Sequence, residues 1–116
     1  VDFHGVHDWN QGIRTFVPDY SVLDDPEFSR RALAASPLSS VDTWKSPVLL
    51  IHGDDDRNVR FSQTVDLVRR IAARGVEYEE LVIVDDTHHF MRHANQLRVN
   101  AAIAAYLEKK LKLPKM

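Results

Sequence analysis

Two groups of acidic and histidine residues each stand directly after an apolar run of the chain. The first group is Asp54, Asp55 and Asp56, and the second is Asp85, Asp86, His88 and His89. A carboxylate that accepts a hydrogen bond from an imidazole fixes the tautomer of the ring and stabilises its protonated form. These residue types therefore predict an acid–base pair of the kind that activates a nucleophile.

The elements that must position these groups are two neighbouring parallel strands. Residues 48–52 are apolar without polar alternation, which is typical of a strand covered on both faces of a parallel sheet. Residues 61–74 have helical periodicity, and residues 78–84 form the next strand. Ligands bind beyond the carboxyl ends of the strands in open parallel sheets, so we expect the two loops to lie side by side there.

The rest of the chain extends this alternation. Residues 1–3 resemble the end of a strand, residues 4–25 are expected to be irregular, residues 26–35 helical, residues 39–47 a connector, and residues 94–111 a long helix with Leu97, Ala101, Ala104, Leu107 and Leu111 toward the core. Alternation of this kind predicts an α/β fold, with parallel strands and flanking helices. Two complete strands are too few for a covered sheet, so the chain is expected to be the C-terminal part of a larger fold.

Composition excludes several classes of function. The chain of 116 residues has 44% hydrophobic and 28% charged residues and a net charge of −2, which gives no electrostatic basis for binding nucleic acid or an anionic membrane. No apolar run is long enough to span a bilayer. Cysteine is absent, which excludes disulfides, thiolate catalysis and cysteine-based zinc sites. The first residue is Val1 rather than Met, so the lack of a signal peptide says nothing about localisation.

The segments around the two groups resemble the prolyl oligopeptidase family of serine peptidases, which have the α/β-hydrolase fold. HGDDDRNV fits the pattern Gly-x-x-Asp-x-x-Val, with Gly53, Asp56 and Val59 in register. VDDTHHF is similar to the family's histidine loop and places His88 in the catalytic position, although His89 stands where Gly or Asp is more usual. VDFHGVHDW resembles the strand and loop after the nucleophile's helix, so the resemblance covers nearly the whole chain.

This resemblance implies a role for five residues. Asp56 would orient the base, and His88 would be the general base and acid. Asn58 would bind the backbone carbonyl of the substrate, while Val6 and Trp9 would form part of the wall of the specificity pocket. The geometric consequence is a hydrogen bond of roughly 2.6–3.2 Å between an Asp56 carboxylate oxygen and His88 Nδ1.

The resemblance also implies what the full protein would do. It would hydrolyse peptide bonds in short peptides through an acyl-enzyme and without a cofactor, and residues 1–116 would be the C-terminal segment of its catalytic domain. The nucleophilic Ser would lie in an upstream segment, because none of Gly5, Gly12, Gly53 and Gly75 stands two residues from a Ser, as Gly-x-Ser-x-Gly requires. We therefore expect this chain alone to be inactive and to self-associate. The resemblance favours a secreted or periplasmic location, while the residues leave the compartment open.

Two alternative functions remain open at this level. One is an esterase or lipase of the same fold, which would lack the N-terminal β-propeller expected of a peptidase of this family. The other is an α/β interaction module without catalytic activity, whose full-length sequence would contain no nucleophilic Ser.

Metal binding is not predicted by either acidic or histidine group. The Asp54-x-Asp56-x-Asn58 spacing is that of a calcium loop, but Val59 and Val65 occupy the positions that require Gly and Glu. Near His89 the chain lacks the Glu of a His-Glu-x-x-His zinc motif. Of the remaining histidines, His4, His7 and His52 are predicted to be structural.

Overall fold

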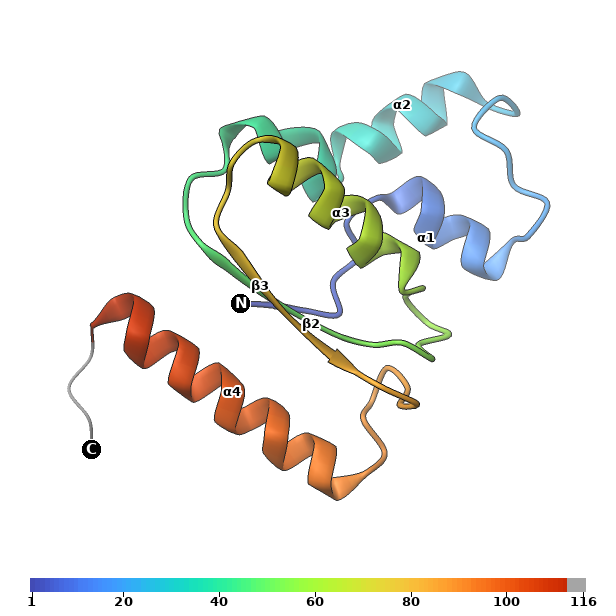
Figure 1. Cartoon of the computed structure of the whole chain (residues 1–116). Coiled ribbons are helices and arrows are strands. Elements are labelled where there is room, and N and C mark those ends of the chain that lie inside the picture. Colours follow the sequence, from blue (N-terminus) through green and yellow to red (C-terminus); the bar gives the residue numbers. More distant parts are fainter. Residues whose placement is uncertain (113–116) are drawn as a thin grey trace.

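The computed structural model describes residues 1–112, in which strands and helices alternate along the chain. The elements are β1 (Asp2–Phe3), α1 (Trp9–Phe16), α2 (Pro26–Ala34), the 3₁₀ helix η1 (Pro37–Thr43), β2 (Val48–Gly53), α3 (Ser62–Ala73), β3 (Tyr78–Ile83) and α4 (His93–Leu111). The strands form one parallel sheet in the order β1-β2-β3. Figure 1 shows α3 on one side of β2 and β3 and α4 on the other. The predicted class, parallel strands with flanking helices, is confirmed.

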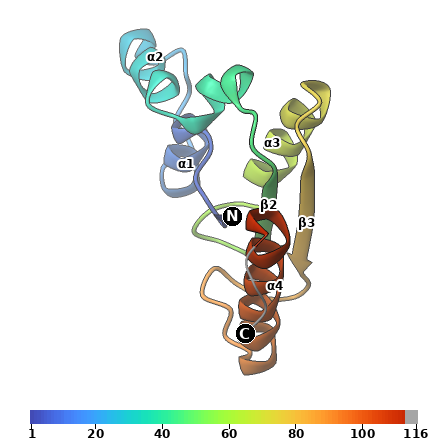
Figure 2. The same ribbon diagram turned by 90° about the vertical axis from the view of Figure 1, so that its left-hand side faces the viewer.

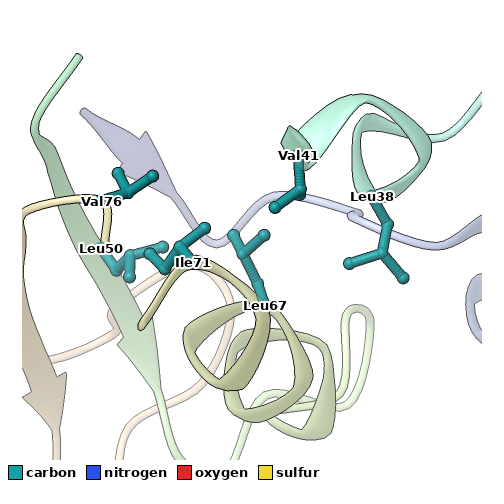
Figure 3. Packing of buried hydrophobic residues seen from close by; sticks show 6 residues of the cluster. All are labelled: Leu38, Val41, Leu50, Leu67, Ile71 and Val76. Atoms are coloured by element: carbon teal, nitrogen blue, oxygen red, sulfur yellow. The ribbon is translucent and has the colours of Figure 1, made fainter. Parts of the chain in front are cut away.

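The core on the α3 side contains Leu50 as its one fully buried residue of β2, and the partly buried Val48 packs against the same cluster. Leu50 points toward Leu67 and Ile71 of α3, and Val41 of η1 and Val76 close the same cluster (Figure 3). Apart from Val48, all of these side chains are buried. The two residues of β2 next to Leu50, Leu49 and Ile51, belong to the core on the α4 side. Successive side chains of β2 therefore enter cores on opposite faces of the sheet. Because both faces are covered, the sequence of β2 does not alternate between polar and apolar residues.

The last helix, α4, faces the sheet with other residues than the sequence predicted. Val99, Ile103 and Tyr106 of α4 pack against the sheet residues on the α4 side. The predicted core residues are instead exposed; they are Leu97, Ala101, Ala104, Leu107 and Leu111. Apolar residues occur on all sides of this helix, so its sequence offers two candidate stripes, and only packing against the sheet selects between them. Figure 2 shows α4 standing against the sheet without a further layer outside it. No helix within residues 1–112, α4 included, is long and apolar enough to cross a membrane.

The region expected to be irregular contains a helix, α1. Asp8 caps its N-terminus, because the Asp8 carboxylate accepts a hydrogen bond from the N–H of Asn10 at 2.9 Å. Further anchors come from the segments after α1: Asn10 Nδ2 donates to Ser29 O, and Trp9 N–H donates to Ser36 Oγ. The prediction of an irregular segment was wrong here, although Trp9, Ile13 and Phe16 have helical spacing. A helix of eight residues is too short to be stable by itself, so it depends on these distant anchors.

Two leucines of matched chemistry test this description of the core. Leu67→Ala should lower the free energy of unfolding by about 3 kcal/mol, because it leaves a cavity in a well-packed core. Leu97→Ala should change it by less than about 0.5 kcal/mol, since surface substitutions have small effects. Leu67 is 0% and Leu97 57% exposed. Urea denaturation of the two variants and the wild type measures the difference. Equal losses would contradict the observed orientation of α4.

Candidate active site

A buried carboxylate, that of Asp56, lies at the centre of the site. Its side chain is 0% exposed, just beyond the end of β2. Oδ1 accepts hydrogen bonds from the N–H groups of Asn58 at 2.9 Å and Val59 at 2.8 Å. Oδ2 contacts the rings of His88, at 2.7 Å from Nδ1, and His52, at 3.1 Å from Nε2. Both oxygens are therefore fully engaged, and the carboxylate is held in one orientation.

These contacts keep Asp56 ionised. Burial raises the pKa of this carboxyl, but hydrogen bonds from the Val59 N–H, the His88 ring and the Asn58 N–H outweigh it. The pKa of Asp56 therefore lies below its ordinary value. An acceptor that is charged at neutral pH is what an imidazole needs if it is to become protonated next to it.

One ring nitrogen of His88 forms a hydrogen bond with the protein, and the other is available to a substrate or a nucleophile. Its Nδ1 contacts Asp56, so in the neutral ring Nδ1 carries the hydrogen and Nε2 has the lone pair. No hydrogen bond within residues 1–112 engages this Nε2, and the side chain is 20% exposed. The face of the ring packs on His4, with ring centroids 3.7 Å apart and an interplanar angle of 44°. His88 can thus accept a proton at Nε2 while Asp56 and His4 hold its ring.

His4 reaches this position through an unusual backbone conformation. Its φ is 42°, in the left-handed region, and its N–H donates to Ile51 O at 2.7 Å. Burial and the neighbouring His88 both lower the pKa of His4, which favours its neutral form. A neutral ring adds no fixed positive charge beside the base.

The loop that carries His88 is organised by a second buried carboxylate, that of Asp86. Its Oδ1 accepts hydrogen bonds from the N–H groups of Thr87 and Met91, and its Oδ2 accepts one from Asn95 Nδ2 at 2.8 Å. The hydrogen bond from Asn95, together with those from the backbone, lowers the pKa of Asp86. Asp86 therefore holds the backbone of the loop in place both before and after His88.

Glycine at position 53 allows the two loops to approach each other. A Cβ on Gly53 would lie 2.5 Å from the carbonyl oxygen of Asp86, which is too close for any other residue type. The same carbonyl accepts a hydrogen bond from the N–H of Asp55, and Asp54 Oδ1 accepts one from the N–H of Asp85. Backbone contact between the loops thus sets the distance between Asp56 and His88.

The structure brings some predicted site residues together and keeps others apart. The expected contact between Asp56 and His88 is present, at 2.7 Å. Asn58 is exposed next to Asp56, beside a pocket of about 560 Å³ lined by Asp54–Arg57 and Arg60–Ser62. Val6 lies near Gly12 of α1, and Trp9 lines a separate pocket of about 310 Å³ between α1 and α2. The substrate-binding roles of Asn58, Val6 and Trp9 stay predictions.

A hydrogen-bond network behind α1 fixes the segment that carries Val6 and Trp9. His7 is buried, with Nε2 at 2.5 Å from Asp2 Oδ2 and Nδ1 at 2.9 Å from Gln63 O. Burial opposes its protonation, but the hydrogen bond to Asp2 prevails and raises the pKa of His7. Gln63 Oε1 accepts from the N–H groups of His7 and Asp8. This segment is therefore bound to α3 rather than free to move.

Sequence reasoning missed three residues that contact the site. His52 was assigned a structural role but bonds Asp56. Asp86 was named only as one acid of the group after the second strand, without a role in organising the His88 loop. The contact of His4 with His88 was not foreseen. One available signal was the polar His52 inside an apolar strand, four residues before an acid. For Asp86, the signal was an acid two residues before the histidine, where it can accept hydrogen bonds from loop N–H groups. Among residues 1–112, no cluster of three or more His, Asp or Glu side chains could hold a metal ion.

The fold places the protein among the α/β-hydrolases. The acylaminoacyl peptidase of Pyrococcus horikoshii superposes with a TM-score of 0.75 at 22% identity, over 97% of this chain and 20% of that one. A puromycin-hydrolyzing peptidase of Mycobacterium tuberculosis superposes with a TM-score of 0.68 at 28% identity, over 74% of this chain and 13% of that one. The predicted α/β-hydrolase fold is confirmed.

The chain belongs to the prolyl oligopeptidase family, whose sequence profile matches residues 3–114. It is 31% identical over 88 residues to dipeptidyl-peptidase 5 of Porphyromonas gingivalis, and 33% identical over 73 residues to the acylamino-acid-releasing enzyme of Mus musculus. These alignments cover 76% and 63% of this chain. The chain spans only 13% and 9% of the length of these two relatives.

The lowered pKa of Asp56 predicts how stability depends on pH. A carboxyl with a lower pKa in the folded state contributes stability above its unfolded pKa, and this contribution is lost as the pH falls through the folded value. Asp56→Asn should therefore lose stability at neutral pH, by about 2 kcal/mol from its weakened hydrogen bonds, and less at acidic pH. Urea denaturation from pH 7 to pH 3 should show the wild-type and variant curves converging below about pH 4.

A neighbouring carboxylate is the control for this experiment. The side chain of Asp55 is exposed, and within residues 1–112 its carboxylate forms one ion pair, a surface contact with Arg57 at 3.5 Å. Asp55→Asn should give a curve parallel to that of the wild type across the whole pH range. A parallel curve for Asp56→Asn as well would show that Asp56 does not carry the charged hydrogen bonds described here.

Proposed function

We propose that the protein is a serine peptidase in which Asp56 and His88 are the acid and the base of a catalytic triad. The observation that carries this proposal is the 2.7 Å contact between Asp56 Oδ2 and His88 Nδ1, with His88 Nε2 open. Charge, burial and access support it together: the carboxylate is buried and ionised, and the ring is 20% exposed. Family membership supports the same reading.

The reaction follows from this arrangement. His88 Nε2 takes the proton of a Ser hydroxyl as its oxygen attacks the scissile carbonyl, and Asp56 stabilises the imidazolium that forms. His88 then gives this proton to the leaving amine, which leaves an acyl-enzyme. Water attacks the ester with His88 again as the base, and the Ser regains its proton when the acid product leaves. No cofactor takes part.

Residues 1–116 would form the C-terminal segment of the catalytic domain. The nucleophilic Ser would come from an upstream segment, which would be a partner of this chain within the same protein. The much greater length of the curated relatives supports this division. An N-terminal β-propeller in the full-length protein would be consistent with the peptidase function.

Short peptides are the proposed substrate class. The relatives named a dipeptidyl-peptidase and an acylamino-acid-releasing enzyme support this choice. Asn58 would donate a hydrogen bond from its exposed amide to a substrate carbonyl. Val6 and Trp9 would contribute to the wall of the pocket for the residue before the scissile bond.

Two histidines next to each other provide a sharp test of the catalytic roles. His88→Ala, in a protein that includes the upstream segment, should lower kcat/KM on a dipeptidyl or acyl-aminoacyl chromogenic substrate by at least about 10³-fold, since it removes the general base. His89→Ala should stay within about threefold of the wild type: its exposed ring packs edge-on against His88, with centroids 5.2 Å apart, but forms no hydrogen bond with Asp56 among residues 1–112. Steady-state kinetics of the wild type and both variants measure this difference.

A fluorophosphonate probe locates the nucleophile. It should label a Ser of the upstream segment and none in residues 1–116. Equal activity of the His88 and His89 variants, or labelling of a Ser within residues 1–116, would refute the proposed assignment.

The isolated chain should self-associate. β1 and the six-residue β3 form the two edges of the sheet, and unpaired sheet edges pair with other chains. Phe3 and Val1 are exposed on β1 and next to it, and the leucines on the outer side of α4 are exposed as well. Sedimentation velocity at micromolar concentrations should show dimers or larger species. A concentration-independent monomer with cooperative unfolding would show that the chain is a self-sufficient domain.

A further inference from the structure

The buried imidazole of His52 has no part in the chemistry proposed above, yet it contacts the acid directly. We propose that His52 is a positioning residue, which holds Asp56 Oδ2 in the place from which that oxygen orients His88. This inference rests on the proposed peptidase function for its kinetic consequences, although its structural content can be measured separately.

The position of His52 excludes a direct catalytic role. It is the fifth residue of β2, and its side chain is 1% exposed, so neither substrate nor solvent reaches it. Both ring nitrogens are occupied: Nδ1 lies 2.7 Å from Thr64 Oγ1, and Nε2 lies 2.8 Å from Val59 O and 3.1 Å from Asp56 Oδ2. Phe61 packs against the ring, with centroids 5.3 Å apart.

The partners of the ring determine its tautomer. A backbone carbonyl and an ionised carboxylate can only accept hydrogen bonds, so Nε2 must carry a hydrogen. In the neutral ring Nδ1 then accepts the hydroxyl hydrogen of Thr64. The Nε2–H is shared between Val59 O and Asp56 Oδ2. Partners from the turn after β2 and from α3 therefore fix the direction of the hydrogen bond to the acid.

This hydrogen bond has a specific effect on the acid. Asp56 Oδ2 receives N–H groups from two rings, His52 on its buried side and His88 on its open side. Without the first, Oδ2 loses one of its two donors, and the hydrogen bonds of Oδ1 with the N–H groups of Asn58 and Val59 leave it free to rotate relative to His88. A displacement on the order of 1 Å in a catalytic constellation can lower the rate about 10²-fold. If His52 only tied Val59 to β2, its loss would reduce stability and leave the rate of the folded enzyme unchanged.

Two polar substitutions of different reach separate these roles. His52→Gln places an amide nitrogen close to the position of ring Nε2, so the donor to Asp56 is kept. His52→Asn has a shorter side chain, which reaches only the region of Nδ1, and the donor is lost. In the protein with its upstream segment, His52→Asn should lower kcat about 10- to 100-fold with KM within about threefold. His52→Gln should recover kcat to within about threefold of the wild type.

Nuclear magnetic resonance of the same protein with ¹⁵N-labelled histidine gives a readout that does not require turnover. The wild type should show His52 as the Nε2–H tautomer and a slowly exchanging Nδ1–H proton of His88. The His88 proton signal should persist in His52→Gln and broaden or disappear in His52→Asn. The tautomer of His52 in the wild type tests the inference even if a variant fails to fold. An Nδ1–H tautomer of His52 would overturn it.

The outcomes distinguish this inference from the proposed function. A wild-type protein without peptidase activity or fluorophosphonate labelling would remove the proposed function, and the tautomer and the His88 signal would still decide whether His52 holds Asp56. An active wild type, with unchanged kcat and an unchanged His88 signal in His52→Asn, would overturn the role of His52 and leave the proposed function standing.

Discussion

The ionised carboxylate of Asp56 is the constraint to which the rest of the site conforms. Its Oδ1 accepts hydrogen bonds from the backbone of Asn58 and Val59. Its Oδ2 accepts them from the rings of His52 and His88. A buried charge is tolerated only when it is paired and hydrogen-bonded. The end of β2, the turn that follows and the loop after β3 must therefore each present a donor to the same two oxygen atoms, and this shared requirement fixes them relative to one another.

The parallel sheet makes this convergence possible. Gly53 at the end of β2 lies opposite Ile83 at the end of β3, so the loops that follow both strands begin at the same level. Side chains at the two ends would normally hold such loops apart. Because Gly53 has no Cβ, the carbonyl of Asp86 can come close enough to accept the N–H of Asp55. A residue without a functional side chain thereby sets the spacing between Asp56 and His88.

Elements defined by local pattern were predictable from the sequence, and elements defined by distant contacts were not. The helix α3 and the strands β2 and β3 were predicted to within a residue or two, because length and apolar pattern are properties of the segment itself. The helix α1 was missed, since it depends on hydrogen bonds to residues beyond its own segment. The orientation of α4 was wrong for a related reason: its apolar residues surround the helix, and only the sheet decides which of them become buried.

The same distinction separates the two histidines that bond Asp56 Oδ2. The contact with His88 was predictable because topology alone brings the loops of adjacent parallel strands together. The contact with His52 was not, because the direction of its ring is set by Thr64 on α3, which no pattern within β2 reveals. The two rings are of one residue type and bond one oxygen, yet one is 1% and the other 20% exposed. Only the more exposed ring keeps a nitrogen without a protein partner among residues 1–112. Access to that nitrogen, rather than residue type or distance from the carboxylate, therefore separates the proposed base, His88, from the residue proposed to position its acid, His52.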